Sequence, residues 1–161
     1  MKLFLDCEFT DFIDCELISI GIVSADGQHE FYAERNDYTD AWCNAFVREA
    51  VLPYLGQFPD VTCNRDALAH RLRTWFSTLP RHVQIASDSM HDRDLLWDAF
   101  DGELPENLDK SIFNLRPLID TTVFNEAVYH YHSLQDRPWH HALHDARAHR
   151  AGWLAWMDAR K

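Results

Sequence analysis

Hydrophobic and polar positions alternate most regularly in the first part of the chain. An apolar run over residues 2–6 predicts a buried strand, and the alternating segment 17–23 predicts a second one. The pair Asp26-Gly27 separates this segment from a third predicted strand around 30–33, and such a pair is the strongest short-range signal for a β-hairpin. These patterns predict that the chain begins as a three-stranded antiparallel meander.

Beyond residue 40 the periodicity becomes that of helices. Apolar residues three and four positions apart, such as Leu68 and Leu72, indicate amphipathic helices that bury one stripe. A short apolar segment at 83–87 is typical of a central strand, whereas 112–119 is ambiguous because Pro117 interrupts it. The predicted helices span residues 41–52, 65–79, 92–100, 121–131 and 141 to the C-terminus.

This order of elements predicts an α/β protein. Three strands followed by alternating helices and strands favour a mixed sheet, a meander extended by parallel strands, with helices on both faces. The 161 residues fit a single domain that spans residues 1–161, and no repeat or low-complexity tract divides them.

Composition and charge narrow the function classes. No apolar run approaches the roughly 18 residues of a membrane span, so we expect a cytoplasmic protein without a membrane partner. The four cysteines show no paired spacing and are expected to be reduced thiols. A formal net charge of −11 argues against a broad basic surface for duplex nucleic acid. It is compatible with an enzyme that contacts a short single strand locally and takes its positive charge from bound metal ions.

Two acidic motifs stand near the two ends of the chain. Side chains two residues apart share one face of a strand, so Asp6 and Glu8 point in the same direction. Carboxylates held that close repel each other unless a proton or a cation lies between them. A divalent metal ion is the favoured solution at neutral pH, although an isolated motif of this kind is more often a solvated pair. Near the C-terminus, His140 precedes Asp145 by five residues.

The order of these motifs resembles that of a nuclease superfamily. An acid-x-acid motif on a first strand, a hydrophobic meander and a late His-x4-Asp motif are similar to the DEDDh 3′-to-5′ exonucleases, which include ribonuclease T and oligoribonuclease. The resemblance covers nearly the whole chain and looks strongest to the small bacterial exoribonucleases described as polyadenylate-specific. It implies a ribonuclease H-like fold and a hydrolase that releases 5′-nucleoside monophosphates from the 3′ end of single-stranded RNA, with a preference for adenylate tracts.

The resemblance also implies a role for each motif residue. Asp6 would bridge two divalent cations, Mg²⁺ or Mn²⁺, while Glu8 and Asp145 would mainly hold the one that carries the attacking water. Two ions about 3.5–4 Å apart stabilise both the attacking and the leaving oxygen of an in-line displacement. His140 would accept the proton of the water, since an imidazole with an ordinary pKa of about 6.5 is neutral at slightly alkaline pH.

The fourth carboxylate departs from the superfamily pattern, in which a His-Asn pair shortly precedes Phe-Asp. The corresponding stretch 86–96 holds three aspartates, Asp88, Asp92 and Asp94. A position just before a helix and three residues ahead of an apolar pair selects Asp92. The other two are then interpreted as helix-capping or solvated acids.

Four residues are placed beside the 3′-terminal nucleotide by the same resemblance. Phe9 would lie against the base or sugar, because every base offers a face for stacking, but packing into the core is an equal alternative. The other three are Thr10, Glu16 and Leu17. Trp139, in the loop before the histidine motif, is a further candidate for the border of the substrate.

The remaining histidines and arginines near the C-terminus are assigned ordinary roles. We expect His141 and His144 at the surface or behind the metal ligands, and His130 and His132 at the surface. A solvated position is likewise expected for two arginines of the last helix, Arg147 and Arg150.

Three alternative functions stay open. The same residues suit a 3′-to-5′ exodeoxyribonuclease, because none of them declares a contact with a 2′-hydroxyl. A catalytically silent nucleic-acid-binding module of the same fold and a purely structural divalent-ion site are rivals from other classes. A homodimer is also left open, with the tryptophan-rich last helix as a candidate contact surface.

Overall fold

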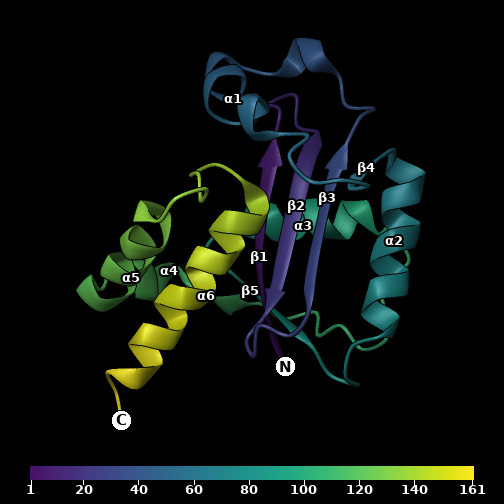
Figure 1. Cartoon of the computed structure of the whole chain (residues 1–161). Coiled ribbons are helices and arrows are strands. Elements are labelled where there is room, and N and C mark those ends of the chain that lie inside the picture. Colours follow the sequence, from purple (N-terminus) through teal and green to yellow (C-terminus); the bar gives the residue numbers. More distant parts are fainter.

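The computed structural model describes residues 1–161 and is built on one six-stranded sheet of order β4-β3-β2-β1-β5-β6 (Figure 1). Strands β1, β2 and β3 pair antiparallel, while β4, β5 and β6 each join parallel to a neighbour. The strands are β1 Lys2–Phe9, β2 Leu17–Ser24, β3 Glu30–Arg35, β4 Thr62–Cys63, β5 Gln84–Ser87 and β6 Phe113–Asn114. The predicted mixed α/β sheet with its opening meander is confirmed.

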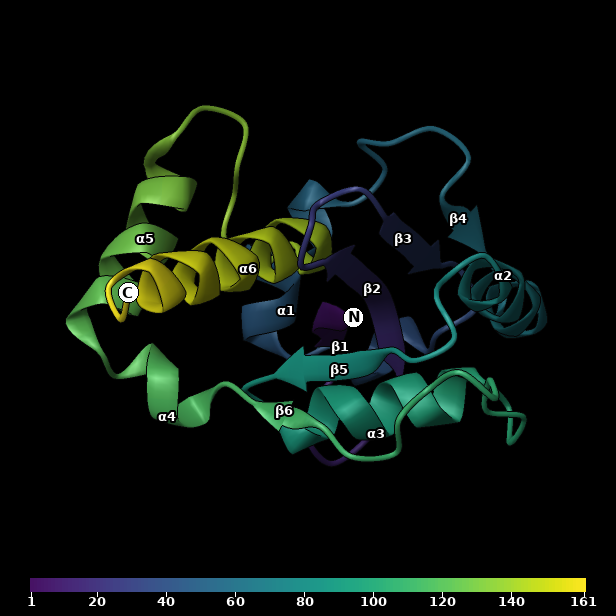
Figure 2. The same ribbon diagram turned by 90° about the horizontal axis from the view of Figure 1, so that it is seen from below.

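Helices cover both faces of this sheet. Helix α6 (Ala142–Asp158) crosses β1 and β2 with α5 (Thr122–Ser133) at its side, and α2 (Arg65–Ser77) and α3 (Met90–Ala99) lie on the opposite face (Figure 2). The short elements are η1 Asp40–Trp42, α1 Ala45–Ala50, η2 Leu52–Tyr54 and α4 Arg116–Ile119. No helix has both the length and the apolar character that a bilayer crossing requires.

Alternation along β1 separates the core from an acidic face. Leu3 and Leu5 are fully buried in the main core, which lies against α2 and α3. Phe4 points to the other side and belongs to a smaller cluster with residues of α4, α5 and α6. Because side chains of a strand alternate between its faces, Asp6 and Glu8 share the side of Phe4, beneath α6.

Backbone contact between α6 and the sheet occurs at Gly21. This residue pairs with Asp6 on β1. A Cβ atom at Gly21 would lie 2.4 Å from backbone atoms of both Ala142 and Leu143, so only a glycine lets the first turn of α6 pass over β2. Asp145 belongs to the same first turn, so this contact also determines which part of β1 its side chain faces.

Two segments differ from their predicted secondary structure. The helix predicted at 41–52 is broken, because the side chain of Asn44 accepts a hydrogen bond from the Val47 N–H and starts α1 after η1. The ambiguous segment 112–119 divides into β6 and α4, and Pro117 lies in the first turn of α4, where a missing N–H costs nothing. The other four predicted helices are confirmed with ends shifted by a few residues.

Replacement of Gly21 by alanine is expected to destabilise the fold, because the added methyl group meets backbone atoms of α6. We expect Gly21→Ala to lower the free energy of unfolding, measured by urea denaturation, by about 3 kcal/mol. Gly102→Ala is the matched control: nothing lies within 4 Å of its Cβ position, and its φ of +81° adds a cost of only about 1 kcal/mol. Equal losses in the two variants would contradict the role of Gly21.

Candidate metal centre

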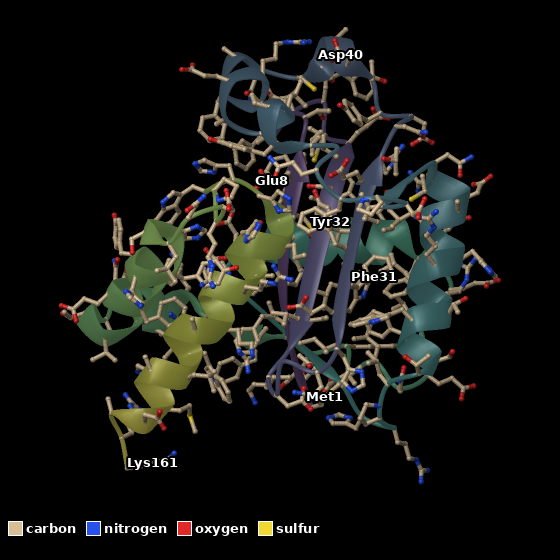
Figure 3. All side chains as sticks on the ribbon, viewed as in Figure 1. Met1, Glu8, Phe31, Tyr32, Asp40 and Lys161 are labelled. Carbon is tan, nitrogen blue, oxygen red and sulfur yellow. The ribbon has the colours of Figure 1, made fainter.

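The first turn of α6 brings Asp145 over the acidic end of β1. Ligand atoms of Glu8, His140 and Asp145 all lie within 4.8 Å of one another. Glu8 comes from β1, and His140 comes from the loop that leads into α6. Figure 3 shows Glu8 beside the N-terminal end of that helix. The two motifs from opposite ends of the chain therefore meet in the fold.

Asp6 and Glu8 carry the electrostatic signature of a crowded acidic site. Burial raises the pKa of Asp6 well above its usual value, and the charges of Asp145, Asp92 and Glu8 raise it further. Burial, followed by the charges of Asp145 and Asp92, raises the pKa of Glu8 to about 8. The charges of Asp145 and Asp92 therefore lie near enough to oppose the ionisation of both Asp6 and Glu8.

Asp92 is the buried member of the three candidate aspartates. It lies in the first turn of α3 with 4% of its surface exposed, and it accepts a hydrogen bond from the Ser87 hydroxyl at 3.0 Å. Burial raises its pKa to about 7, against the opposing effect of this hydrogen bond. Its helix begins after Ser89, whose hydroxyl accepts hydrogen bonds from two backbone N–H groups of the first turn.

The other two aspartates of this stretch lie outside the cluster or at its edge. Asp94 is exposed and forms an ion pair with Arg93. Asp88 lies 3.8 Å from the guanidinium of Arg116, although its charge still raises the pKa of Asp92. Of the three candidate aspartates, Asp92 is thus the one that burial favours as a member of the cluster. It is also the one selected by its position in the sequence.

The cluster has little positive charge of its own. Of the four acids, only Asp145 has a basic partner, the Nε2 atom of His132 at 3.0 Å from Oδ1. Buried carboxylates without such partners must hold protons or cations. Hard divalent cations such as Mg²⁺ and Mn²⁺ prefer oxygen ligands, which all four acids offer. Of the four, only Glu8 and Asp145, together with His140, have ligand atoms within 4.8 Å of one another, and Asp6 and Asp92 lie outside that group.

His140 has an unusual backbone conformation. Its φ of +59° lies in the left-handed region, which is uncommon for a residue other than glycine. The imidazole is exposed, and it packs edge-on against the ring of Phe46 with 4.8 Å between the centroids. Backbone strain at a side chain that meets two carboxylates is typical of a functional site.

The expectation that His132 lies at the surface is wrong. His132 is buried, and its Nδ1 atom lies 3.0 Å from the carbonyl oxygen of Arg137. Its ring stacks on Trp139 with 3.9 Å between centroids, while Nε2 faces Asp145. His132 therefore ties the loop 134–141 to the acidic cluster. His130, in contrast, is exposed as expected.

His141 and His144 are buried behind the acidic cluster. The backbone N–H of His141 donates to Oδ2 of Asp145 at 3.1 Å, and its ring stacks on Tyr32. Nδ1 of His144 lies 2.9 Å from the hydroxyl of Tyr131. Burial lowers the pKa of His141, and burial together with His141 lowers the pKa of His144 to about 4, so both are neutral at physiological pH.

The two arginines expected on a solvated face of α6 bind the β2–β3 hairpin instead. Nε of Arg147 donates to the carboxylate of Glu30 at 2.8 Å. Nε of Arg150 donates to the carbonyl oxygen of Ala25 at 3.0 Å. These contacts fix the middle of α6 on the sheet.

Two of the residues predicted to contact a nucleotide have buried side chains, which leave no surface for a ligand to contact. Thr10 is fully buried, and its hydroxyl donates to the carbonyl of Asp14 and accepts from the N–H of Glu16. Leu17 is 4% exposed and belongs to the main core. Both side chains shape the loop between β1 and β2 rather than a ligand surface.

The other two predicted contacts lie at the edge of this loop. Phe9 packs partly against the main core, and its ring also meets those of Phe12 and His91 at centroid distances of 5.0 and 4.6 Å. The carboxylate of Glu16 accepts a hydrogen bond from the backbone N–H of Thr39. Phe9 thus joins the core to a surface aromatic group, so both interpretations of this residue retain support.

Comparison with known proteins assigns no family to this chain. Neither a scan against protein-family models nor a search of curated proteins found a match.

In metal-free protein, the raised pKa values make stability depend on pH. The folded state binds the protons of Glu8 and Asp92 more tightly than the unfolded chain, so this contribution is complete below their ordinary pKa values and is lost as pH rises through about 7 and 8. Burial of His144 acts in the opposite sense, but only below its ordinary pKa of 6.5. We expect the melting temperature of chelator-treated protein to fall between about pH 6.5 and 8.5.

Mg²⁺ or Mn²⁺ is expected to reverse this loss, because the cations compete with the protons for the same oxygens. At a concentration of 100 times Kd, binding adds about 2.7 kcal/mol of stability, which is a rise of several degrees in Tm. Glu8→Gln should weaken both the pH dependence and the cation effect, whereas Glu106→Gln, at an exposed position, should change neither. A melting temperature indifferent to cations at pH 8 would argue against a metal site.

Proposed function

We propose that this chain is a metal-dependent 3′-to-5′ exoribonuclease of the DEDDh type, with a ribonuclease H-like fold, that releases 5′-nucleoside monophosphates from single-stranded RNA. One observation carries the proposal: Glu8, His140 and Asp145, from opposite ends of the chain, present ligand atoms within 4.8 Å of one another. Asp6 and Asp92 belong to the same cluster of mutually opposed charges. The mixed sheet with its opening meander is a second line of support.

The four acids would hold two divalent cations, Mg²⁺ or Mn²⁺. Such ions, when bound, lower the pKa of water and offset the negative charge that develops on a phosphodiester during displacement. His140 lies exposed beside Glu8 and Asp145, where its imidazole can take a proton from the attacking water.

Asp145 is held in a fixed orientation for this task. Its Oδ1 atom lies 3.0 Å from Nε2 of His132, and Oδ2 accepts a hydrogen bond from the backbone N–H of His141 at 3.1 Å. With one oxygen hydrogen-bonded and the other beside an imidazole, this carboxylate loses little freedom when it binds a cation, and such supporting contacts typically change metal affinity by 10- to 100-fold.

The choice of RNA and of adenylate tracts comes from the resemblance alone. The site itself suits an exodeoxyribonuclease equally well, because a 2′-hydroxyl contact distinguishes the two substrates and none is evident among the site residues. RNA and DNA are therefore compared in the same assay.

The proposal predicts a ladder of products that shorten from the 3′ end. Purified protein is incubated with 5′-labelled single-stranded RNA or DNA in Mg²⁺, Mn²⁺ or chelator, and homopolymers test the adenylate preference. We expect nucleoside 5′-monophosphates from RNA only when a cation is present. Preferential shortening of DNA would favour the exodeoxyribonuclease. Strand binding without any product would favour a silent binding module, and cation-dependent melting without binding would favour a structural ion site.

Substitution of the three candidate aspartates separates the fourth metal ligand from its neighbours. Asp92→Asn is expected to abolish turnover, since it removes a negative oxygen ligand from the buried cluster. The matched variant Asp94→Asn, at an exposed position, should leave turnover unchanged. Abolished turnover in Asp88→Asn, with activity retained in Asp92→Asn, would assign the site to Asp88 instead.

His140→Ala is expected to lower kcat by about 10²- to 10⁴-fold, the usual contribution of a general base. His130→Ala, at an exposed position of α5, is the control and should retain full activity. In the unmodified protein, kcat should fall towards acidic pH, because a protonated base cannot accept the proton of the water. A flat profile, with chemistry rate-limiting, is incompatible with a histidine base.

A further inference from the structure

A groove that His140 helps to line runs along the loop that precedes α6. Its volume is about 560 Å³, and one wall comes from α1 and η2 while the other comes from residues 137–140. A second hollow of about 360 Å³ shares Tyr54, His132 and Arg137 with it and continues it away from His140. Its walls include three aromatic residues and one arginine, namely Phe46, Tyr54, Trp139 and Arg137.

Arg137 is the only lysine or arginine that lines this groove, and its guanidinium forms no ion pair or hydrogen bond. Most arginines of the chain form ion pairs or donate to carbonyl groups, as Arg147 and Arg150 do. The guanidinium of Arg137 forms neither contact and lies over the ring of Tyr131, with Cζ 4.5 Å from the centroid. Glu49 and Asp136 line the same hollows, so the surface offers one cationic contact rather than a basic patch.

The position of Arg137 is fixed relative to the acidic cluster. Its carbonyl oxygen lies 3.0 Å from Nδ1 of His132, and Nε2 of the same ring lies 3.0 Å from Oδ1 of Asp145. His132 is further held by its stack on Trp139. One buried ring therefore connects the backbone of Arg137 to a predicted metal ligand.

We propose that this groove is the track of a single nucleic-acid strand and that Arg137 binds one of its backbone phosphates. The inference rests on the proposed function, since the scissile phosphate would lie at the four acids and Arg137 would meet a different phosphate of the same strand. A guanidinium matches a phosphate with two parallel hydrogen bonds. The rings of Phe46, Tyr54 and Trp139 provide faces on which bases stack whatever their sequence.

The test compares a long and a minimal substrate. A ten-nucleotide RNA places phosphates in the groove, whereas the p-nitrophenyl ester of a nucleoside 5′-monophosphate carries only the phosphate that is attacked. Arg137→Ala retains the backbone carbonyl that contacts His132. The substitution is therefore expected to affect the cleavage of the RNA strand and not that of the ester. We expect KM for the RNA to rise about tenfold or more with kcat unchanged, and kcat/KM for the ester to stay the same.

Binding measurements give an independent readout. Fluorescence anisotropy of labelled RNA, in the His140→Ala background and in Mg²⁺, yields the salt dependence of Kd. Loss of one phosphate contact should reduce the slope of log K against log salt by about 0.7. Arg137→Lys should restore part of the affinity, because an ammonium attracts phosphate without the paired geometry. Arg81→Ala is the matched control, since Arg81 also lacks ion pairs and hydrogen bonds and lies outside the groove.

Each outcome has a distinct consequence. An unchanged salt slope and KM in Arg137→Ala overturns the inference. An equal loss on the ester overturns it as well, because Arg137 would then act on the metal centre and not on a distant phosphate. A protein that binds RNA but cleaves neither substrate removes the proposed function, while its salt slope still decides whether Arg137 contacts a phosphate.

Discussion

The site depends on the contact between the backbone of α6 and the backbone of β2 at Gly21. Because Gly21 pairs with Asp6 across the sheet, the contact that seats the helix also fixes the distance from Asp145 to the acids of β1. Arg147 and Arg150 hold the next turns of α6 on the hairpin, so the helix has little room to slide. The acidic cluster is thus a consequence of helix docking, and its geometry is as rigid as the packing beneath it.

This docking gathers charge that the fold does not neutralise. Of the four acids, only Asp145 has a basic side chain within 4 Å, that of His132, and the neutral rings of His141 and His144 contribute no positive charge. In the absence of metal, protons must bind in place of cations. The pKa values of these carboxylates are therefore raised far above their usual range. Repulsion of this kind between carboxylates lowers the stability of the fold. It is characteristic of sites that bind a charged ligand, because the ligand relieves the repulsion.

Local patterns predict most of the fold but only part of the site. Strand alternation is sufficient to place Asp6 and Glu8 on one face, and the register before an apolar pair singles out Asp92 as the buried aspartate. The role of His132 depends on how α5 packs against α6, which no local pattern encodes. The break in the helix predicted at 41–52 is predictable from the sequence, because asparagine is a favoured N-cap residue and Asn44 occupies that position. The two-residue strand β4 is too short for any periodicity.

The scarcity of unpaired cationic side chains relates the groove to the candidate metal centre. In a chain with a net charge of −11, most arginines form ion pairs or hydrogen bonds within the fold, and Arg137 is the arginine without them that lines the groove beside His140. A polyanionic strand would therefore gain most of its electrostatic attraction from cations held by the four acids, with one guanidinium and stacked rings as the remaining contributions. Strand binding and cation binding are then thermodynamically linked, because each reduces the charge that opposes the other. His132 lies 3.0 Å from Asp145 on one side and 3.0 Å from the Arg137 carbonyl on the other, so the proposed linkage would have a structural component beside the electrostatic one.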